Sequence, residues 1–245
     1  MNGYAAFICI ISFVYMFFIT LFIIVRHSDW NKLGQAVAIC VSSVLFCNSF
    51  IFMTTLVREF GQMASKPVIY LYPEEEMNVS VKLSKPENII CDYPEYNDGW
   101  NVIAKPNGDL KELNNNKDLY CLYYEADMMP AHIEDEGFVV KSADTADFLD
   151  EKLGILGLND KERNEFIVYW LPKLEANKYN YIRFLSQDEI NQIEKLMITP
   201  KPDKFIRIMM SYKGLDYPIA VKEQKLNPVN RTGFTVVEWG GTEIN

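Results

Sequence analysis

Histidine is almost absent from this 245-residue chain, which has only His27 and His132. Its five cysteines show no metal-binding spacing, and the sequence contains neither an intact nucleophile elbow nor a Ser/His/Asp set. Zinc sites and Cys–His nucleophile arrangements therefore lack the residues that they require. The sequence predicts no metal site and no cofactor.

Basic side chains are also scarce, because 24 lysines and arginines face 33 aspartates and glutamates, for a formal net charge of −9. From Lys66 onward the counts are 21 basic and 31 acidic residues, so this part is more acidic than the whole chain. An acidic surface repels phosphate backbones. Nucleic acid is therefore not expected as a partner.

Charge is missing altogether from two apolar runs near the N-terminus, residues 4–25 and 35–57. Each holds about 22 residues, which at about 1.5 Å per helical residue crosses a hydrocarbon core of about 30 Å. A cleaved signal peptide would need a basic leading segment, and the first three residues contain no lysine or arginine. We therefore expect residues 1–60 to form a two-helix transmembrane hairpin that contacts the lipid bilayer through residues 4–57.

The loop between these runs carries Arg26 and Lys32 against one acid, Asp29, and such basic loops tend to stay cytoplasmic. Residues 61–66 would then be a short linker, and residues 67–245 an extracytoplasmic domain of a two-span cell-membrane protein. Arg58 and Lys66 lie on the other side of the second run. They leave open the opposite orientation, with a cytoplasmic regulatory domain on the hairpin.

The segment from residue 67 to residue 141 has mostly the pattern of antiparallel β-sheet. Apolar and polar residues alternate from Asn78 to Leu83, which is typical of a half-buried strand. Residues 100–105 and 109–113 flank a Pro-Asn-Gly turn and predict a hairpin. Further strands are expected at 68–72, 119–125 and 138–141.

Helical periodicity follows. One helix is predicted from Asp144 to a glycine stop at Gly157, and a second begins at a capping box formed by Asn159 and Glu162, with Pro172 expected to kink or shorten it. Strand patterns return at 179–185, 196–199, 205–213 and 233–239. The predicted fold class is α+β, a transmembrane hairpin followed by a mainly antiparallel β domain with an inserted helical pair.

Two cysteines, Cys91 and Cys121, lie in the domain, about 30 residues apart. They would form a disulfide in an oxidising compartment and remain buried thiols in a reducing one. The sequence leaves both alternatives open.

Carboxylates beside aromatic residues are the candidates for catalysis, namely Glu125, Glu165 and Glu238. Strand alternation places Glu238 on the face of Phe234 and Val236, and burial there would raise its carboxyl pKa. Two carboxylates with different environments are the arrangement that glycoside hydrolysis uses. The alternative is structural, with Glu238 pairing with an arginine such as Arg183 or Arg207.

The candidate ligand-binding residues are Asp98, Trp100, Trp170 and Trp239. Tryptophan rings can serve as stacking platforms for sugars. A chain with 13% aromatic residues mostly needs such rings for its core, so the sequence favours a core role for the tryptophans over a binding role.

Five segments resemble an uncharacterised bacterial domain family. They are residues 66–73 (KPVIYLYP), 93–100 (YPEYNDGW), 137–141 (GFVVK), 164–172 (NEFIVYWLP) and 233–241 (GFTVVEWGG). The resemblance spans most of residues 66–241 and implies a shared domain. It implies no reaction, ligand or catalytic residue.

The sequence thus favours a domain without identified catalytic activity that binds an envelope component, such as a cell-envelope glycan, or a protein partner. The alternative is a carboxylate-based envelope glycan hydrolase. Geometry discriminates between them, because a hydrolase needs two carboxyl groups about 5–9.5 Å apart in a cleft walled by aromatic side chains.

Overall fold

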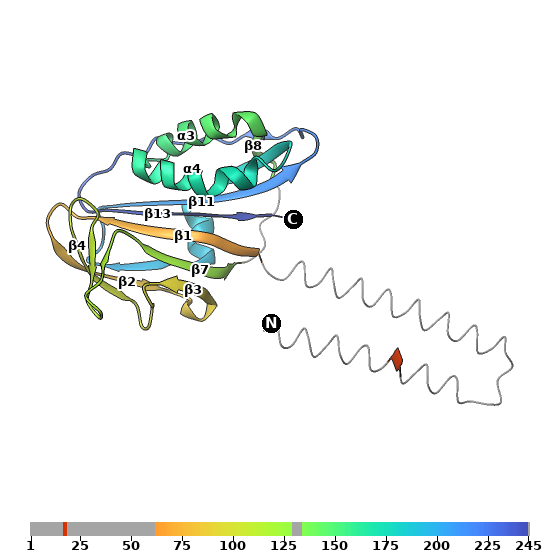
Figure 1. Ribbon diagram of the computed structural model, residues 1–245. Helices are drawn as coiled ribbons and strands as arrows, with labels where there is room; N and C mark the ends of the chain where they lie inside the picture. The colour runs from red at the N-terminus through yellow and green to blue at the C-terminus, as the bar shows by residue number, and fades with distance from the viewer. Residues whose placement is uncertain (1–16, 19–61, 129–133, 245) are drawn as a thin grey trace, which may run out of the picture. The chain divides into compact units, whose positions relative to one another are not determined.

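The structure is a computed structural model that describes residues 17–18, 62–128 and 134–244 (Figure 1). The chain divides into two compact units, residues 1–61 and residues 62–245. In the first unit, only the helical pair Phe17 and Phe18 is described. The second unit contains all strands and helices discussed below.

The predicted transmembrane hairpin requires a correction. In the described parts of the chain, no helix is long and apolar enough to cross a membrane. The longest described helix, α4 (Asp160–Leu174), has 15 residues, which at about 1.5 Å each gives about 22 Å against a hydrocarbon core of about 30 Å. It also carries charged side chains in its first turn. Apart from Phe17 and Phe18, runs 4–25 and 35–57 lie outside the described residues.

The fold class is therefore corrected to a mainly β-sheet chain with three α-helices, α3 (Thr145–Ile155), α4 and α5 (Gln187–Ile193). The expected two-span membrane localisation is corrected with it, since it depended on the hairpin. Contact of residues 4–57 with a lipid bilayer lies outside what the structure describes.

An eight-stranded sheet is the centre of the domain, in the order β12-β8-β9-β11-β13-β1-β7-β3. Neighbouring strands are antiparallel except for the parallel pairs β11–β13 and β12–β8. Its strands are β12 (Lys222–Glu223), β8 (Glu136–Lys141), β9 (Tyr179–Phe184), β11 (Lys204–Leu215), β13 (Thr235–Glu243), β1 (Gln62–Tyr72), β7 (Leu122–Met128) and β3 (Ile89–Tyr93).

A smaller sheet has five strands in the order β10-β2-β4-β5-β6. They are β10 (Leu196–Thr199), β2 (Met77–Leu83), β4 (Trp100–Ala104), β5 (Leu110–Glu112) and β6 (Asp118–Leu119). Short 3-10 helices occupy Pro86–Asn88 and Ser142–Asp144.

Two hydrophobic cores lie on the two faces of the large sheet. Helices α3 and α4 cover one face, and the small sheet faces the other (Figure 1). Alternation along β1 shows the division, because Val68 and Tyr70 enter the helix-side core while Ile69 and Leu71 enter the core between the sheets. Strands buried on both faces hold the central sheet rigidly.

Local sequence signals are reproduced well. The predicted hairpin is β4–β5, with Ala104 opposite Leu110, and the predicted capping box of Asn159 and Glu162 begins α4. Pro172 lies inside α4, which ends two residues later at Leu174. Residues 62–66, expected as a linker, form the beginning of β1.

Candidate functional site

Glu238 is held in a buried ion pair. Its carboxylate pairs with the guanidinium of Arg207, both side chains are 1% exposed, and the Tyr124 hydroxyl donates a hydrogen bond of 2.7 Å to it. Burial, followed by the charge of Glu238, raises the pKa of Tyr124 well above its ordinary value, so this phenol remains a donor. The structure thus gives the arginine pairing that the sequence left as the alternative for Glu238.

The same arginine ties three elements together. Its Nη1 donates to the Asn191 side-chain oxygen and to the Glu194 carbonyl oxygen, at 2.8 Å each, while its Nε reaches Glu238 on β13. The oxygens of Glu238, Asn191 and Glu194 that contact this guanidinium each accept a hydrogen bond from it. Arg207, with its charge balanced by Glu238, therefore connects α5 to strands β11 and β13.

The other two candidate glutamates lie on the helix side of the sheet. Glu165 on α4 accepts a hydrogen bond from the Tyr70 hydroxyl, and Glu125 on β7 accepts one of 2.6 Å from Tyr123. Glu238 projects into the opposite core, beside Tyr124. The sheet therefore separates it from Glu125 and Glu165, and the three carboxylates do not converge on one cleft.

Both tyrosines of this helix-side cluster are kept protonated. Burial, reinforced by the hydrogen bond to Glu165, raises the pKa of Tyr70, and burial reinforced by Glu125 raises the pKa of Tyr123. Each phenol therefore donates throughout the physiological range. Glu165 and Glu125 thus each accept a hydrogen bond from a neutral phenol.

The candidate ligand-binding tryptophans are core residues. Trp100 is 1% exposed and donates from Nε1 to the Pro94 carbonyl oxygen at 2.7 Å, while Trp170 and Trp239 are buried in the helix-side core. Their burial leaves no ring face for a sugar. Asp98 lies in an exposed turn before β4.

The candidate disulfide is not formed in the structure, where Cys91 and Cys121 both carry thiols. Cys91 on β3 lies opposite Glu125 of β7, and Cys121 precedes Glu125 by four residues. At about 3.4 Å per strand residue this offset of four residues is about 14 Å, whereas a disulfide needs Cα atoms about 4.4–6.8 Å apart. Strand register therefore holds the two thiols apart.

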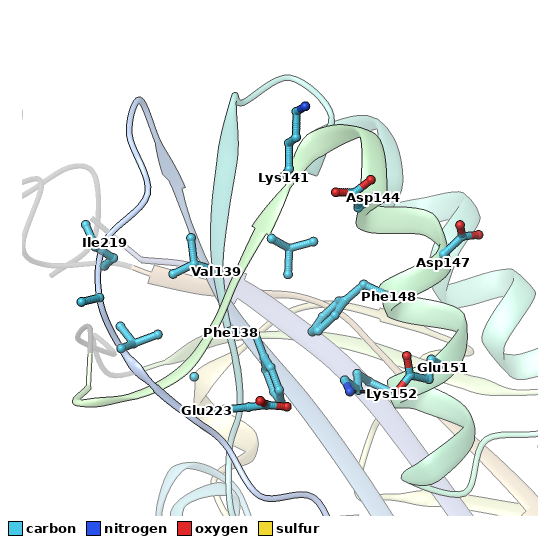
Figure 2. Close-up of a pocket in the computed structure, with 14 residues that line it drawn as sticks. Phe138, Val139, Lys141, Asp144, Asp147, Phe148, Glu151, Lys152, Ile219 and Glu223 are labelled. Atoms are coloured by element: carbon cyan, nitrogen blue, oxygen red, sulfur yellow. Dashed lines mark hydrogen bonds and ion pairs between the residues drawn. The ribbon is translucent and has the colours of Figure 1, made fainter.

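An open hollow of about 660 Å³ lies beside β8 and is called the β8 groove here (Figure 2). Gly137–Lys141 form its sheet side. One stripe of α3, with the residue before this helix, forms its helix side, and Ile219–Val221 with Glu223 form the third side. The helix side consists of Asp144, which directly precedes α3, and of Asp147, Phe148, Glu151 and Lys152 on one stripe of α3. A volume of this size suits a bound ligand or segment of a partner, for which about 300–1,000 Å³ is usual.

The β8 groove exposes strand backbone. On the outer side of β8, the carbonyl oxygens of Asp135 and Gly137 accept hydrogen bonds from the backbone amides of Lys222 and Gln224, at 2.9 and 3.1 Å. The Ser142 amide points to the opposite side and donates to the Lys178 carbonyl oxygen. Strand backbone alternates direction, so Val139 and Lys141 point their amides toward the groove. The pairing of β8 with β12 ends at Gly137. Within the described chain, Val139 therefore has no strand partner on its outer side.

Aromatic packing shapes the helix side of the groove. Phe138 and Phe148 meet edge to face with centroids 5.1 Å apart, and the Lys152 ammonium lies over both rings, at 5.4 and 5.8 Å from their centroids. The same ammonium donates to Glu151 at 2.9 Å. Lys152 thus already interacts with Glu151 and with both phenylalanine rings.

None of the groove residues was among the sequence candidates. The sequence patterns predict a strand at Phe138–Lys141 and a helix at α3. They do not reveal that this strand lies near a sheet edge. In residues 62–128 and 134–244, no cluster of three or more metal-ligating side chains is found.

No family model, curated protein or solved structure matches the chain. The resemblance of five segments to an uncharacterised family therefore gains no support from these comparisons.

Proposed function

We propose that residues 62–245 form a binding domain without catalytic activity, which takes up an extended segment of a partner protein in the β8 groove. The segment adds to the sheet as one more strand beside β8. The observation that carries this proposal is the outward-facing backbone of Val139, which has no strand partner among the described residues and lies in an open hollow.

Strand addition uses main-chain hydrogen bonds for affinity and the pockets for alternate side chains for specificity. The Val139 amide and carbonyl, with the Lys141 amide, supply the main-chain groups. The Lys141 carbonyl oxygen is already an acceptor for the Thr145 hydroxyl at 3.3 Å, so three groups remain available to the incoming strand. The mixed apolar and charged walls of the groove provide the side-chain contacts.

Binding is preferred to hydrolysis because of the positions of the carboxylates. Glu238 is neutralised by Arg207 inside the protein, while Glu125 and Glu165 each accept from a different tyrosine. Of the two binding partners that the sequence suggests, a protein is preferred to a glycan. The groove offers a strand edge, whereas the tryptophans that would stack on sugars are buried.

The test compares two substitutions of one residue in the full chain. Val139→Pro removes the outward amide and places a ring in the path of an added strand, whereas Val139→Thr keeps both the amide and the β-branched shape. The outward amide makes no bond to β9, so both variants should fold, and equal denaturation midpoints would verify this.

Random ten-residue peptides displayed on phage are selected on the unmodified chain, and the selected peptides are synthesised. We expect them to bind Val139→Thr like the parent and to lose at least tenfold in affinity for Val139→Pro. Peptides that bind the proline variant undiminished, or a selection that returns no binder, would overturn strand addition at β8.

A further inference from the structure

We infer that the segment bound in the β8 groove is basic, with two lysine or arginine side chains flanking one apolar residue. This inference rests on the proposed strand addition and adds the chemistry of the partner to it. It is carried by the charges of the groove and by their spacing along α3.

The charge of the groove is unbalanced. Four acids, Asp144, Asp147, Glu151 and Glu223, line it against two bases, Lys141 and Lys152. Lys152 is already paired with Glu151. Asp144, Asp147 and Glu223 have no ion-pair partner among the described residues, and neither does Lys141, so three unpaired carboxylates face one unpaired ammonium and the excess negative charge favours a cationic ligand.

The two faces of β8 decide which partner residues meet these acids. Phe138 and Val140 face α3 and the helix-side core, while Val139 points the other way, toward Ile219 (Figure 2). In a strand added to β8, the residue opposite Val139 shares its face, and the residues on either side of it share the face of α3. The central residue therefore meets Ile219–Val221 and favours an apolar side chain.

The flanking residues meet α3. Alternate side chains of a strand are about 6.8 Å apart, and helix residues three positions apart have Cβ atoms about 5–6 Å apart. Asp144, the residue that precedes α3, and Asp147 in its first turn are three positions apart, and both line the groove. Two basic side chains in a strand thus match two carboxylates at the beginning of α3, one each, and their aliphatic stems can cover Phe148.

This charge also selects against the obvious competitor, a second copy of the chain. Two β8 grooves placed edge to edge would bring their unpaired aspartates together, and like charges repel. A basic segment from another protein relieves the same imbalance.

The experiment uses three fluorescein-labelled heptapeptides whose central residues, flanked by Ser-Gly and Gly-Ser, are Lys-Val-Lys, Glu-Val-Glu or Val-Lys-Val. Binding to the full chain is measured by fluorescence polarisation in 50 mM and 500 mM salt. The third peptide contains one lysine and can therefore present at most one to the α3 side, in any register. The first peptide can present two lysines to that side. We expect the first to bind at least tenfold more tightly than the second, more tightly than the third, and more weakly in high salt.

A double variant, Asp144→Asn with Asp147→Asn, tests the assigned carboxylates. It should lower the affinity for the Lys-Val-Lys peptide at least fivefold, and the affinity for the Glu-Val-Glu peptide should stay the same or rise. The matched control is Asp150→Asn, on the same helix but outside the groove and paired with Arg163 at 3.0 Å. It should bind all three peptides as the parent does.

The outcomes separate this inference from the proposed function. Equal binding of the lysine and glutamate peptides, with both lost in Val139→Pro, would overturn the basic segment and keep strand addition. Tight binding of the lysine peptide that Val139→Pro leaves intact would overturn strand addition. No binding of any peptide at millimolar concentration would overturn both.

Discussion

Replacing Arg207 by methionine is the substitution expected to destabilise the domain most. Methionine keeps much of the apolar stem but removes the charge, so the carboxylate of Glu238, 1% exposed, stays in the core without its cation. The Tyr124 hydroxyl would be its remaining hydrogen-bond donor. The oxygens of Asn191 and Glu194 also lose the donor that each now has at 2.8 Å.

The magnitude follows from these losses. Removing one partner of a buried ion pair costs about 3–5 kcal/mol, because the other charge is left uncompensated. The two lost hydrogen bonds add about 1 kcal/mol each at most. The expected loss of about 3–7 kcal/mol is a large part of a typical unfolding free energy of about 5–15 kcal/mol. Adding Glu238→Gln removes the orphan charge, keeps an acceptor for Tyr124, and should restore about 2 kcal/mol.

The assay is urea unfolding of the full chain, followed by tryptophan fluorescence and far-ultraviolet circular dichroism. Unfolding free energies are compared between variants whose dependence on urea concentration has the same slope. Arg163→Met is the control, because the acids that pair with Arg163 are exposed, and a loss below about 1 kcal/mol is expected. A loss below about 1 kcal/mol for Arg207→Met, or a double variant less stable than the single one, would refute the buried pair.

Three further outcomes are expected. Ser186→Ala removes the capping box of α5 and should cost about 1 kcal/mol in the same urea assay. Gly241→Ala places a Cβ 2.8 Å from a carbonyl oxygen and should cost about 1–3 kcal/mol. Gly154→Ala inside α3 should change the stability by less than about 1 kcal/mol, because the gain in helix propensity is offset by a tight contact of 3.3 Å with the Arg163 guanidinium, which Asp150 and Asp160 hold in place. Burial raises the pKa of Tyr70 and Tyr124, so their neutral forms stabilise the fold below pH about 10 and this contribution falls above it. Absorbance at 295 nm should therefore show them ionising only together with unfolding; earlier ionisation would contradict their burial.

The sequence predicts those elements whose signals are local. The β4–β5 hairpin follows from a turn of three residues, and the start of α4 follows from Asn159 and Glu162, which bond to each other's backbone amides at 2.9 Å. The helix α5 has its own capping box at Ser186 and Glu189, but only seven residues, too short for a periodic pattern. The parallel pairing of β11 with β13 has no local signal, because it depends on how the chain returns between them.

The candidate site shows the same limit. Alternation correctly places Glu238 on the face of Val236, but its partner Arg207 is 31 residues away, so burial and pairing could not be separated from the sequence alone. Trp100 shows the same limit for an aromatic residue. One hydrogen bond to the Pro94 carbonyl satisfies its indole and allows the ring to be wholly buried, and the sequence alone does not reveal this partner of the ring nitrogen.

The two edges of the large sheet differ in a way that favours β8 over β3 for the proposed strand addition. At the other edge, the pairing of β3 with β7 is interrupted by a register shift between Ile89 and Cys91, and such irregularities hinder the docking of another strand. At β8, the two residues of β12 cover only Glu136 and Gly137, and the strand continues regularly opposite β9 to Lys141. An uncovered regular edge invites unwanted pairing, and acids beside it limit that risk by repelling further acidic chains. The acidic groove thus combines an accessible backbone with an excess of negative charge, and the proposed binding of a basic strand depends on both features.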